Sequence, residues 1–357
     1  MKKTNINFLL ITIMVLFCVL QVAAIPGNYL SMKGTVHTHS FHDQEDSLSV
    51  KEIVELQGDD GLPVWFGRSV RKVVCLTGEC RIARLWLFWD GTGDYLGFQL
   101  YNDEELTKTD HDAFSSDDYR KLDRILRDSL SFIKHISQED LVFNESLDGR
   151  SGATQPAYKE QLVEGAAYTC YSLWHTVYGN TRTKIYDIIQ SRCDSTYLNK
   201  LLNSNNFLYR KWAVRYLIEH PQQQKWFDLT VFRFLSNEYE ELALLALDYL
   251  NPEMLKQPDV QQEFYRLFRN SDVMRRFQIM RRLSQLDHVD ENIVLYLLNQ
   301  FDKQEISASS LIYVYKCINQ EHLKNNHITK KLNKFLKHKN NFVRTITQQV
   351  YDKSHIQ

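Results

Sequence analysis

The stretch CRIARLWLFWDGTGDYLGFQLY, residues 80–101, holds two strand patterns on either side of a short turn. Residues 85–89, LWLFW, are apolar at every position. Because neighbouring side chains of a strand point to opposite faces, this run predicts a strand that is covered on both faces, unlike a strand at an exposed edge. The sequence DGTGD at 90–94 has the glycine and aspartate residues that form turns. The stretch therefore predicts a β-hairpin.

Further strand and helix patterns flank this hairpin. KVVCL at 72–76 indicates another strand, and SVKEIVELQG at 49–58 indicates a short helix that ends at its glycine. Amphipathic helical periodicity follows over residues 114–133, where Ser115 and Asp118 have the spacing of a capping box.

A second helical segment is expected to begin near Pro156, a residue well suited to a first helical turn, and to end at Gly179. Cys170 falls on its apolar face and is expected to be buried. Strands mixed with helices between about residues 30 and 180 indicate an α+β or α/β domain.

From Ile185 onward the strand patterns vanish, and the helical segments begin to look alike. LLNSNNFLYRKWAVRYL from Leu201 is echoed by FLSNEYEELALLALDYL from Phe234 and by LFRNSDVMRRFQIMRRL from Leu267, at intervals of 33 residues. A helix, a polar turn and a second helix that recur in this way predict a stacked α-solenoid, because neighbouring repeats bury one another's apolar faces.

Weaker copies of the pattern begin at Leu297 and Phe335. All of these segments resemble HEAT-like repeats. The fold class expected for the chain is therefore α+β, with a mixed domain over residues 25–180 and an all-α HEAT-like solenoid over residues 181–357. The surface of such a solenoid generally binds a partner or braces an adjoining domain.

The net charge bears on the class of partner, and the N-terminal segment bears on where the chain is located. Lys+Arg number 43 and Asp+Glu 44, so no overall field attracts nucleic acid. Residues 1–24, MKKTNINFLLITIMVLFCVLQVAA, have the lysines, apolar run and terminal small residues of a secretory signal cleaved after Ala24. The alternative is an uncleaved anchor, because the apolar run approaches the lower length limit for spanning a bilayer. We expect an exported chain, periplasmic or extracellular, that meets a membrane only if this segment is retained.

Export gives the cysteines a second meaning, because thiols can pair outside the cytoplasm. Cys75 and Cys80 flank the four residues LTGE, a spacing compatible with a hairpin whose opposed positions lie within reach of a disulfide. A structural disulfide and a redox-active or metal-binding pair both fit this spacing.

The heptapeptide DGRSGAT, residues 148–154, resembles the flavinylation motif of the FMN-binding domain family: Asp, two variable residues, Ser or Thr, Gly, Ala, then Thr or Ser. The resemblance implies an FMN-binding-like domain in which a flavin transferase attaches FMN to Thr154 through a phosphoester after export. It also implies that the transferase recognises the other fixed positions of the motif, which are Asp148, Ser151, Gly152 and Ala153.

The residue types at these positions suit that chemistry. Attachment needs a hydroxyl, and a glycine lets the backbone approach a phosphate closely. A helix that begins near Pro156 would add N–H groups and a positive dipole end. The same residues also describe an ordinary loop, in which the Thr154 hydroxyl caps the helix and contributes about 1 kcal/mol. Both interpretations of Thr154 are open at this point.

A bound isoalloxazine ring would need an apolar, partly stacked bed. The aromatic side chains of the predicted hairpin offer such a bed or, alternatively, form the core: Trp86, Phe88, Trp89, Tyr95 and Phe98. Trp174 and His175 receive no catalytic role, because a lone histidine near a helix end is more often a surface or capping group.

Two other clusters have competing interpretations. His37 and His39 alternate along an expected strand, close to His42 and Asp43, so zinc or copper is one interpretation and solvated histidines near the mature N-terminus the other. Residues 324–344 include many lysines and no acidic residue. They are either a patch for an anionic lipid, glycan or protein, or the polar outer face of a terminal repeat.

Two functions are therefore predicted as alternatives. The first is an exported electron carrier, or oxidoreductase component, with FMN on Thr154 and a redox partner docked on the helical repeats. The second is a non-redox binding or scaffold protein, which is not an enzyme and in which the solenoid is the interaction surface. Neither one involves a metal or nucleic acid.

Overall fold

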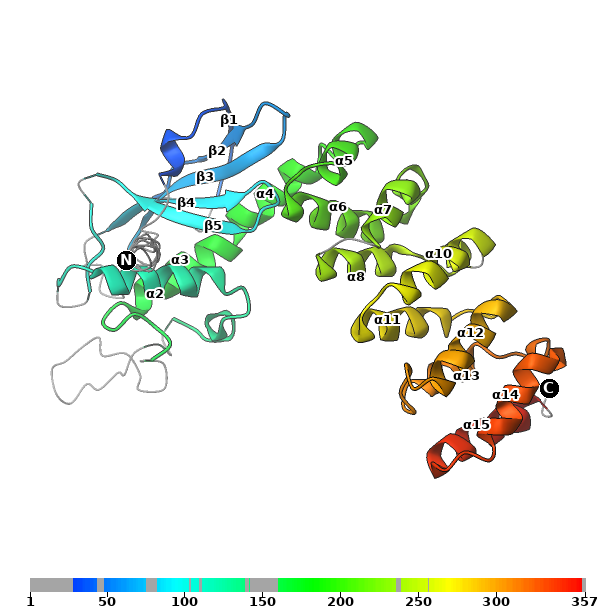
Figure 1. Cartoon of the computed structure of the whole chain (residues 1–357). Coiled ribbons are helices and arrows are strands. Elements are labelled where there is room, and N and C mark those ends of the chain that lie inside the picture. Colours follow the sequence, from blue (N-terminus) through cyan, green and yellow to red (C-terminus); the bar gives the residue numbers. More distant parts are fainter. Residues whose placement is uncertain are drawn as a thin grey trace, which may run out of the picture. The chain divides into compact units, whose positions relative to one another are not determined.

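The computed structural model describes residues 28–43, 48–74, 82–102, 104–108, 111–138, 141, 160–235, 239–255 and 257–354. The chain forms two compact units, Met1–Lys200 and Leu201–Gln357 (Figure 1). Residues 181–200, which the sequence pattern assigns to the helical repeats, lie in the same unit as the sheet. The fold class is α+β with a C-terminal helical region, as the sequence predicts.

The first unit is built on a five-stranded antiparallel sheet whose strands follow chain order, β1-β2-β3-β4-β5. The hairpin predicted from residues 80–101 is confirmed as the last two strands, and its turn closes with the Asp90 N–H donating to the Asp94 carbonyl. The strands are β1 (Thr35–Ser40), β2 (Glu52–Gln57), β3 (Pro63–Lys72), β4 (Ala83–Asp90) and β5 (Tyr95–Leu100).

Two of the local predictions are wrong. Residues 52–57 form β2 and not a helix, because Ile53 and Leu56 are buried on opposite faces of the sheet, and burial on both sides imitates the spacing of a helix. The strand expected at 72–76 is absent at residues 73 and 74, because β3, which starts at Pro63, ends at Lys72. Residues 75–81, which include Cys75 and Cys80, lie outside the described residues.

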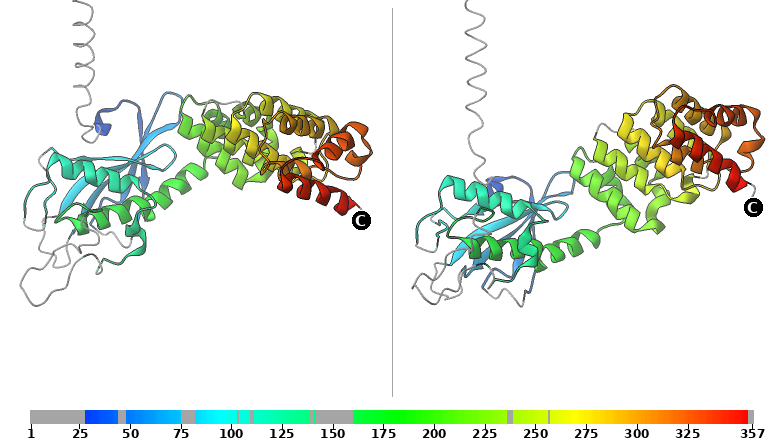
Figure 2. Two further views of the ribbon diagram at one scale, coloured as in Figure 1. Left: turned by 60° about the horizontal axis from the view of Figure 1, so that its bottom comes forward. Right: turned by 90° about the horizontal axis from the view of Figure 1, so that it is seen from below.

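Helices cover one face of this sheet. Helices α2 (Ser116–Arg127) and α3 (Ala167–Tyr178) lie along the same side, as Figure 1 and the views of Figure 2 show. The indole N–H of Trp89 on β4 donates to the Val177 carbonyl of α3 at 3.0 Å. The side chains between the sheet and the helices are fully buried, among them Phe66, Val70, Leu85, Leu87, Trp89 and Phe98.

The predicted helix boundaries hold in part. The capping box of Ser115 and Asp118 is present at the start of α2. The helix ends at Arg127 and does not continue to residue 133, because the Asp128 carboxylate accepts the Leu130 N–H and the chain turns before the short 3-10 helix η2 (Phe132–His135).

The second helix begins later than predicted. Residues 160–166 are turn and bend, with Gly165 at φ +71°, and α3 begins only at Ala167. Pro156, the predicted start, lies outside the described residues. Gly179 caps the end of α3, and Cys170 is fully buried, both as predicted.

After α4 (Asn180–Gln190) the described residues form helices and turns without strands. Helices α6, α8, α11, α13 and α15 pack side by side in that order, and α12 packs on α14 in a second row. The helices are α5 (Ser195–Leu202), α6 (Phe207–Glu219), α7 (Asp228–Phe234), α8 (Glu240–Tyr249), α9 (Pro252–Leu255), α10 (Pro258–Arg269), α11 (Val273–Leu283), α12 (Glu291–Asp302), α13 (Leu311–Lys316), α14 (Asn326–Phe335) and α15 (Asn341–Ser354), with 3-10 turns η5 (Pro221–Trp226) and η6 (His322–Lys324).

The 33-residue interval is visible in the packing. Leu217, Leu250 and Leu283 occupy the same position in successive copies, and all three are buried. Ala213, Ala246 and Ile279 form a second such set, also fully buried. The interval therefore places core side chains at equivalent positions of α6, α8 and α11. No helix in the described part of the chain is long and apolar enough to cross a membrane.

Candidate functional site

All five residues of the flavinylation motif that we singled out lie between 142 and 159, outside the described residues: Asp148, Ser151, Gly152, Ala153 and Thr154. The residues on either side are packed in the first unit, since Leu141, Leu162 and Val163 are fully buried. The part of the chain that contains the motif therefore begins and ends at fixed points of the α+β unit. The roles proposed for Thr154 stay predictions.

Helix α3, which follows the motif, is held in place by side-chain hydrogen bonds. The Trp174 indole N–H donates to the Asp128 carbonyl at 2.9 Å, and the Tyr178 hydroxyl donates to the Leu126 carbonyl at 2.9 Å. Both acceptors lie at the C-terminal end of α2. Trp174 thus fixes one helix against another.

His175 on the same helix has an unused hydrogen-bonding atom. Its ring packs on Tyr171, with 4.2 Å between centroids, and a hydrogen bond joins it to the backbone of Ile133. Its buried Nε2 has no partner among the described residues. Burial lowers the pKa of His175, and the bond to Ile133 offsets only part of this effect. Burial therefore favours the neutral ring, whose Nε2 accepts or donates a hydrogen bond according to the tautomer.

The five aromatic residues considered as a flavin bed do not form one surface. Trp86 and Phe88 lie on one face of the sheet, and Trp89, Tyr95 and Phe98 lie on the other, because they occupy alternate positions of paired strands. Of the five, only Trp86 is more than slightly exposed. Four of these side chains are core residues, and the partly buried Trp86 packs against the core, which agrees with the second interpretation of their sequence.

The sheet face that α2 and α3 leave uncovered is also aromatic. Trp65 and Tyr29 pack on Phe88 with ring centroids 5.2 and 4.5 Å away. Gly67 and Gly97 make room for these rings, since a Cβ on Gly67 would meet Phe88 and one on Gly97 would meet the Tyr29 hydroxyl. This cluster is a small second core closed by the 3-10 turn η1 (Tyr29–Ser31).

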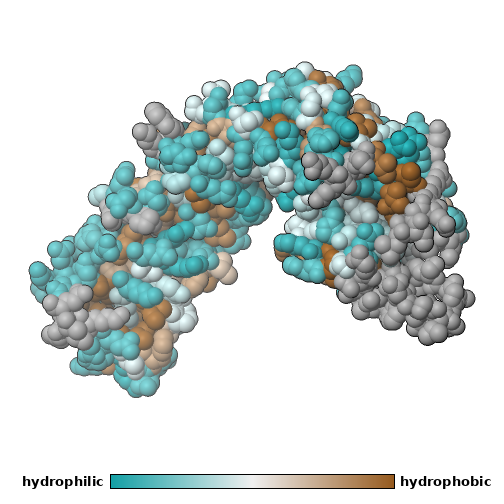
Figure 3. All heavy atoms as spheres, turned by 180° about the vertical axis from the view of Figure 1, so that it is seen from behind, coloured by the Kyte–Doolittle hydropathy of each residue, from teal (hydrophilic) through white to brown (hydrophobic). Residues whose placement is uncertain are grey.

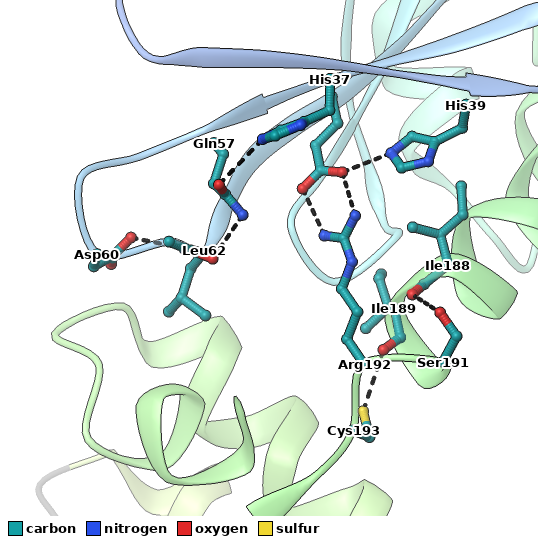
Figure 4. Close-up of polar contacts among 12 residues, drawn as sticks. His37, His39, Gln57, Asp60, Leu62, Ile188, Ile189, Ser191, Arg192 and Cys193 are labelled. Atoms are coloured by element: carbon teal, nitrogen blue, oxygen red, sulfur yellow. Dashed lines mark hydrogen bonds and ion pairs between the residues drawn. The ribbon is translucent and has the colours of Figure 1, made fainter. Parts of the chain in front are cut away.

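A polar cluster is centred on Glu55, a fully buried carboxylate on β2 that contacts the labelled His39 and Arg192 in Figure 4. Arg192 donates two hydrogen bonds to it, of 2.6 and 2.7 Å, and the His39 Nε2 lies 2.7 Å from its Oε2. Burial alone would raise the pKa of Glu55, but the bonds and charges of Arg192 and His39 outweigh burial and lower it. Glu55 is therefore ionised at neutral pH.

Local structure places Arg192 opposite this carboxylate. Arg192 follows α4, where the Ser191 hydroxyl donates to the Ile188 carbonyl at 2.7 Å and the Cys193 thiol donates to the Ile189 carbonyl at 3.3 Å. These two bonds occupy carbonyls at the C-terminal end of the helix. A cation at this end is also favoured by the helix dipole.

The two histidines interpreted as metal ligands point toward β2. As alternation predicts, they share a face of β1: His39 contacts Glu55, and the His37 Nε2 lies 3.2 Å from the Gln57 Oε1. Among the described residues, no three His, Cys, Asp or Glu side chains are grouped so that they could hold a metal ion.

A second buried ion pair holds the other end of α4. Arg68 on β3 is fully buried, donates to the Thr181 hydroxyl at 2.8 Å and to the Val50 carbonyl at 3.2 Å, and lies 3.6 Å from Asp43. Asn180, the first residue of α4, donates to the same carboxylate at 3.0 Å. Charged groups of the sheet thus contact both ends of α4, and this arrangement is suited to positioning a helix.

A comparison of the chain with protein families, with curated proteins and with solved structures finds no match in any of the three. Functional interpretation therefore depends on the chain's own residues.

Sequence reasoning missed Glu55 and Arg68. Each is a charged residue within a run that is otherwise largely apolar, EIVELQ and PVWFGRSV. A charge at a position that must be buried requires a partner. The charged residues within apolar runs are visible in the sequence, but the sequence does not show which residues pair with them.

Proposed function

We propose that this chain is an exported flavoprotein in which FMN, joined to Thr154 through a phosphoester, serves as an electron carrier. The observation that carries the proposal is the heptapeptide DGRSGAT, which combines an acceptor hydroxyl with a glycine and an alanine beside it. Bound FMN would supply one- or two-electron transfer, and the protein would hold and orient it.

Two features of the described residues support a ligand near this segment. The residues on both sides of the motif are packed into the α+β unit, so a group on Thr154 would stay tethered to that unit. The neutral His175 Nε2 on α3, the helix that follows the motif, lacks a partner in the described part of the chain. A buried polar atom without a partner costs about 1–3 kcal/mol, which a complementary group of a ligand that reaches Nε2 would recover.

The attachment step requires a flavin donor that contains a pyrophosphate, because FMN itself has no leaving group at its phosphorus. The Thr154 oxygen forms a bond to the FMN phosphorus, and the pyrophosphate bond of the donor breaks. The second nucleotide leaves with the oxygen, and the hydroxyl proton goes to solvent. A flavin transferase would catalyse this exchange.

The test is an intact mass of the exported chain made together with a flavin transferase. We expect the mass of one FMN, lost in Thr154→Val and retained in Thr154→Ser, because valine matches threonine in shape but lacks the hydroxyl. Yellow colour should remain with the polypeptide after denaturation. An unmodified mass in the presence of an active transferase would exclude the proposal.

The second candidate function is a binding or scaffold protein without flavin, and the stacked helices favour it. Apolar side chains reach the surface of the helical unit, most fully at Leu229 and Val273, each 79% exposed. Figure 3 shows the hydrophobic side chains as separate patches on a largely hydrophilic surface. A colourless exported chain that retains a specific partner, and loses it in Leu229→Ser with Val273→Ser, would favour this function.

A further inference from the structure

The last helical pair of the chain carries a concentrated positive charge. No acidic residue occurs between Glu321 and Asp352. The same interval contains these basic residues: Lys324, Lys330, Lys331, Lys334, Lys337, Lys339 and Arg344. The chain as a whole has a net charge of −1, so this charge is local.

Several of these lysines lie on α14 or in the turn that follows it, and α14 lies with α15 at the C-terminal end of the row of helices in Figure 1. Helix α14 buries Ile328, Leu332 and Phe335. Lys330 and Lys334 come two residues after Ile328 and Leu332, which turns them by roughly 200° to the outer side, and Lys337 lies in the turn after the helix. These three lysines and Lys339 together form what we call the basic face.

Little of this charge is neutralised within the protein. Asp302 of α12 pairs with Lys331, at 2.7 Å, and with Lys334, and these contacts lower the pKa of Asp302. Lys334 is still 62% exposed. Lys330, Lys337 and Lys339 are exposed and make no ion pair with any described residue.

The kind of cation indicates the kind of partner. Arginine recognises phosphates and carboxylates through its planar fork, whereas lysine is a hydrated point charge and is depleted in protein interfaces. Arg344, the one arginine here, is already used, since it donates to the His338 and Lys339 carbonyls at 2.7 and 3.0 Å and so ties α15 to the loop before it. The remaining lysines suit a diffuse anionic surface.

An exposed aromatic side chain follows these lysines in the sequence. Phe342, at the start of α15, follows Lys339 by three residues and is 45% exposed. Lysines beside an exposed aromatic ring are the pattern of segments that lie on anionic bilayers, where each lysine contributes about 1 kcal/mol.

We propose that the basic face of α14, together with Phe342, binds the headgroup surface of an anionic phospholipid membrane. This contact does not depend on residues 1–24 or on flavin. It gives the chain a reversible, salt-sensitive association with membranes even where the N-terminal segment is removed.

The experiment is sedimentation of the exported, purified full chain with vesicles of phosphatidylglycerol and phosphatidylcholine, compared with vesicles of phosphatidylcholine alone. We expect binding only to the anionic vesicles and its loss at about 0.5 M salt, where charges are screened over a few ångströms. A retained N-terminal anchor would bind both kinds of vesicle and is distinguished in this way.

Charge reversal tests the location of the site. Lys330→Glu with Lys337→Glu should weaken binding to the anionic vesicles at least about tenfold. The matched control is Arg233→Glu with Arg281→Glu, which changes two exposed cations of the same unit and the net charge equally. It should shift binding by less than about twofold, and circular dichroism should show that both variants are folded.

Three outcomes would overturn the proposal. They are equal binding to neutral and anionic vesicles, equal weakening by the two charge-reversed variants, and tighter binding to soluble polyglutamate than to anionic vesicles. The last result would assign the basic face to an acidic protein partner.

Discussion

Glu55 shows how one side chain can determine the position of a helix. Its carboxylate is fully buried and is stabilised by Arg192, a residue 137 positions away in the sequence, and by His39. Such a pair contributes little net stability when it forms but is costly to break, because the remaining charge is left without a partner. The pair therefore fixes the position of the C-terminal end of α4 more than it adds stability.

Acid should weaken this contact. The pKa of Glu55 is lowered in the folded state, so its contribution to stability is fully present above the unfolded pKa, near 4.5, and is lost as the pH falls through the lower folded pKa. Glu55→Gln should reduce the free energy of unfolding by about 1.5–3 kcal/mol at pH 7. The free energies of unfolding of Glu55→Gln and wild type, measured by urea unfolding, should approach each other between pH 5 and pH 3.

The control for this prediction is Glu52→Gln on the same strand, where the side chain is exposed. Its stability should follow that of the wild type across the pH range. A difference between wild type and Glu55→Gln that stays constant from pH 7 to pH 3 would contradict the role given to Glu55. Sequence alone could suggest that Glu55 needs a partner, but it could not identify Arg192, because the two meet only through the fold of the whole unit.

At the scale of elements, features fixed by neighbouring residues could be predicted and features fixed by distant packing could not. The hairpin of β4 and β5 and the capping box of α2 depend on residues a few positions apart. The strand β2 was mistaken for a helix because its periodicity reflects two covered faces, and those faces exist only once α4 and η1 pack on the sheet.

The capping box makes a prediction at this scale. Ser115→Ala removes the oxygen that accepts the Asp118 N–H and should lower the free energy of unfolding by about 1 kcal/mol. Ser116→Ala, one residue further on and also exposed, removes no cap and should be neutral or slightly stabilising, because alanine is the better helix former. Chemical unfolding followed by circular dichroism measures both, and equal effects of the two substitutions would argue against the cap.

At the scale of the whole chain, the sequence predicted the division into a mixed region and a helical region, because a change from strand to helix periodicity is a property of long segments. It also predicted the 33-residue interval, which the burial of Leu217, Leu250 and Leu283 reproduces. The candidate site was harder to place. The motif at 148–154 is a local signal in the sequence, and the described structure shows only the packed residues on either side of it.

Helices α6, α8, α11, α13 and α15 contact one another in that order, so a defect in one of them should reach its direct neighbours first. Leu250→Ala, in the turn after α8, removes a buried side chain and should cost about 2–5 kcal/mol. Amide hydrogen exchange read by mass spectrometry should then show faster exchange in α6, α8 and α11, which pack side by side, with little change in α15 or in β4. Leu229→Ala, which truncates an exposed side chain, should leave exchange unchanged. If Leu250→Ala instead raises exchange uniformly from β4 to α15, the chain unfolds as one cooperative body, and nearest-neighbour stacking does not describe its helical unit.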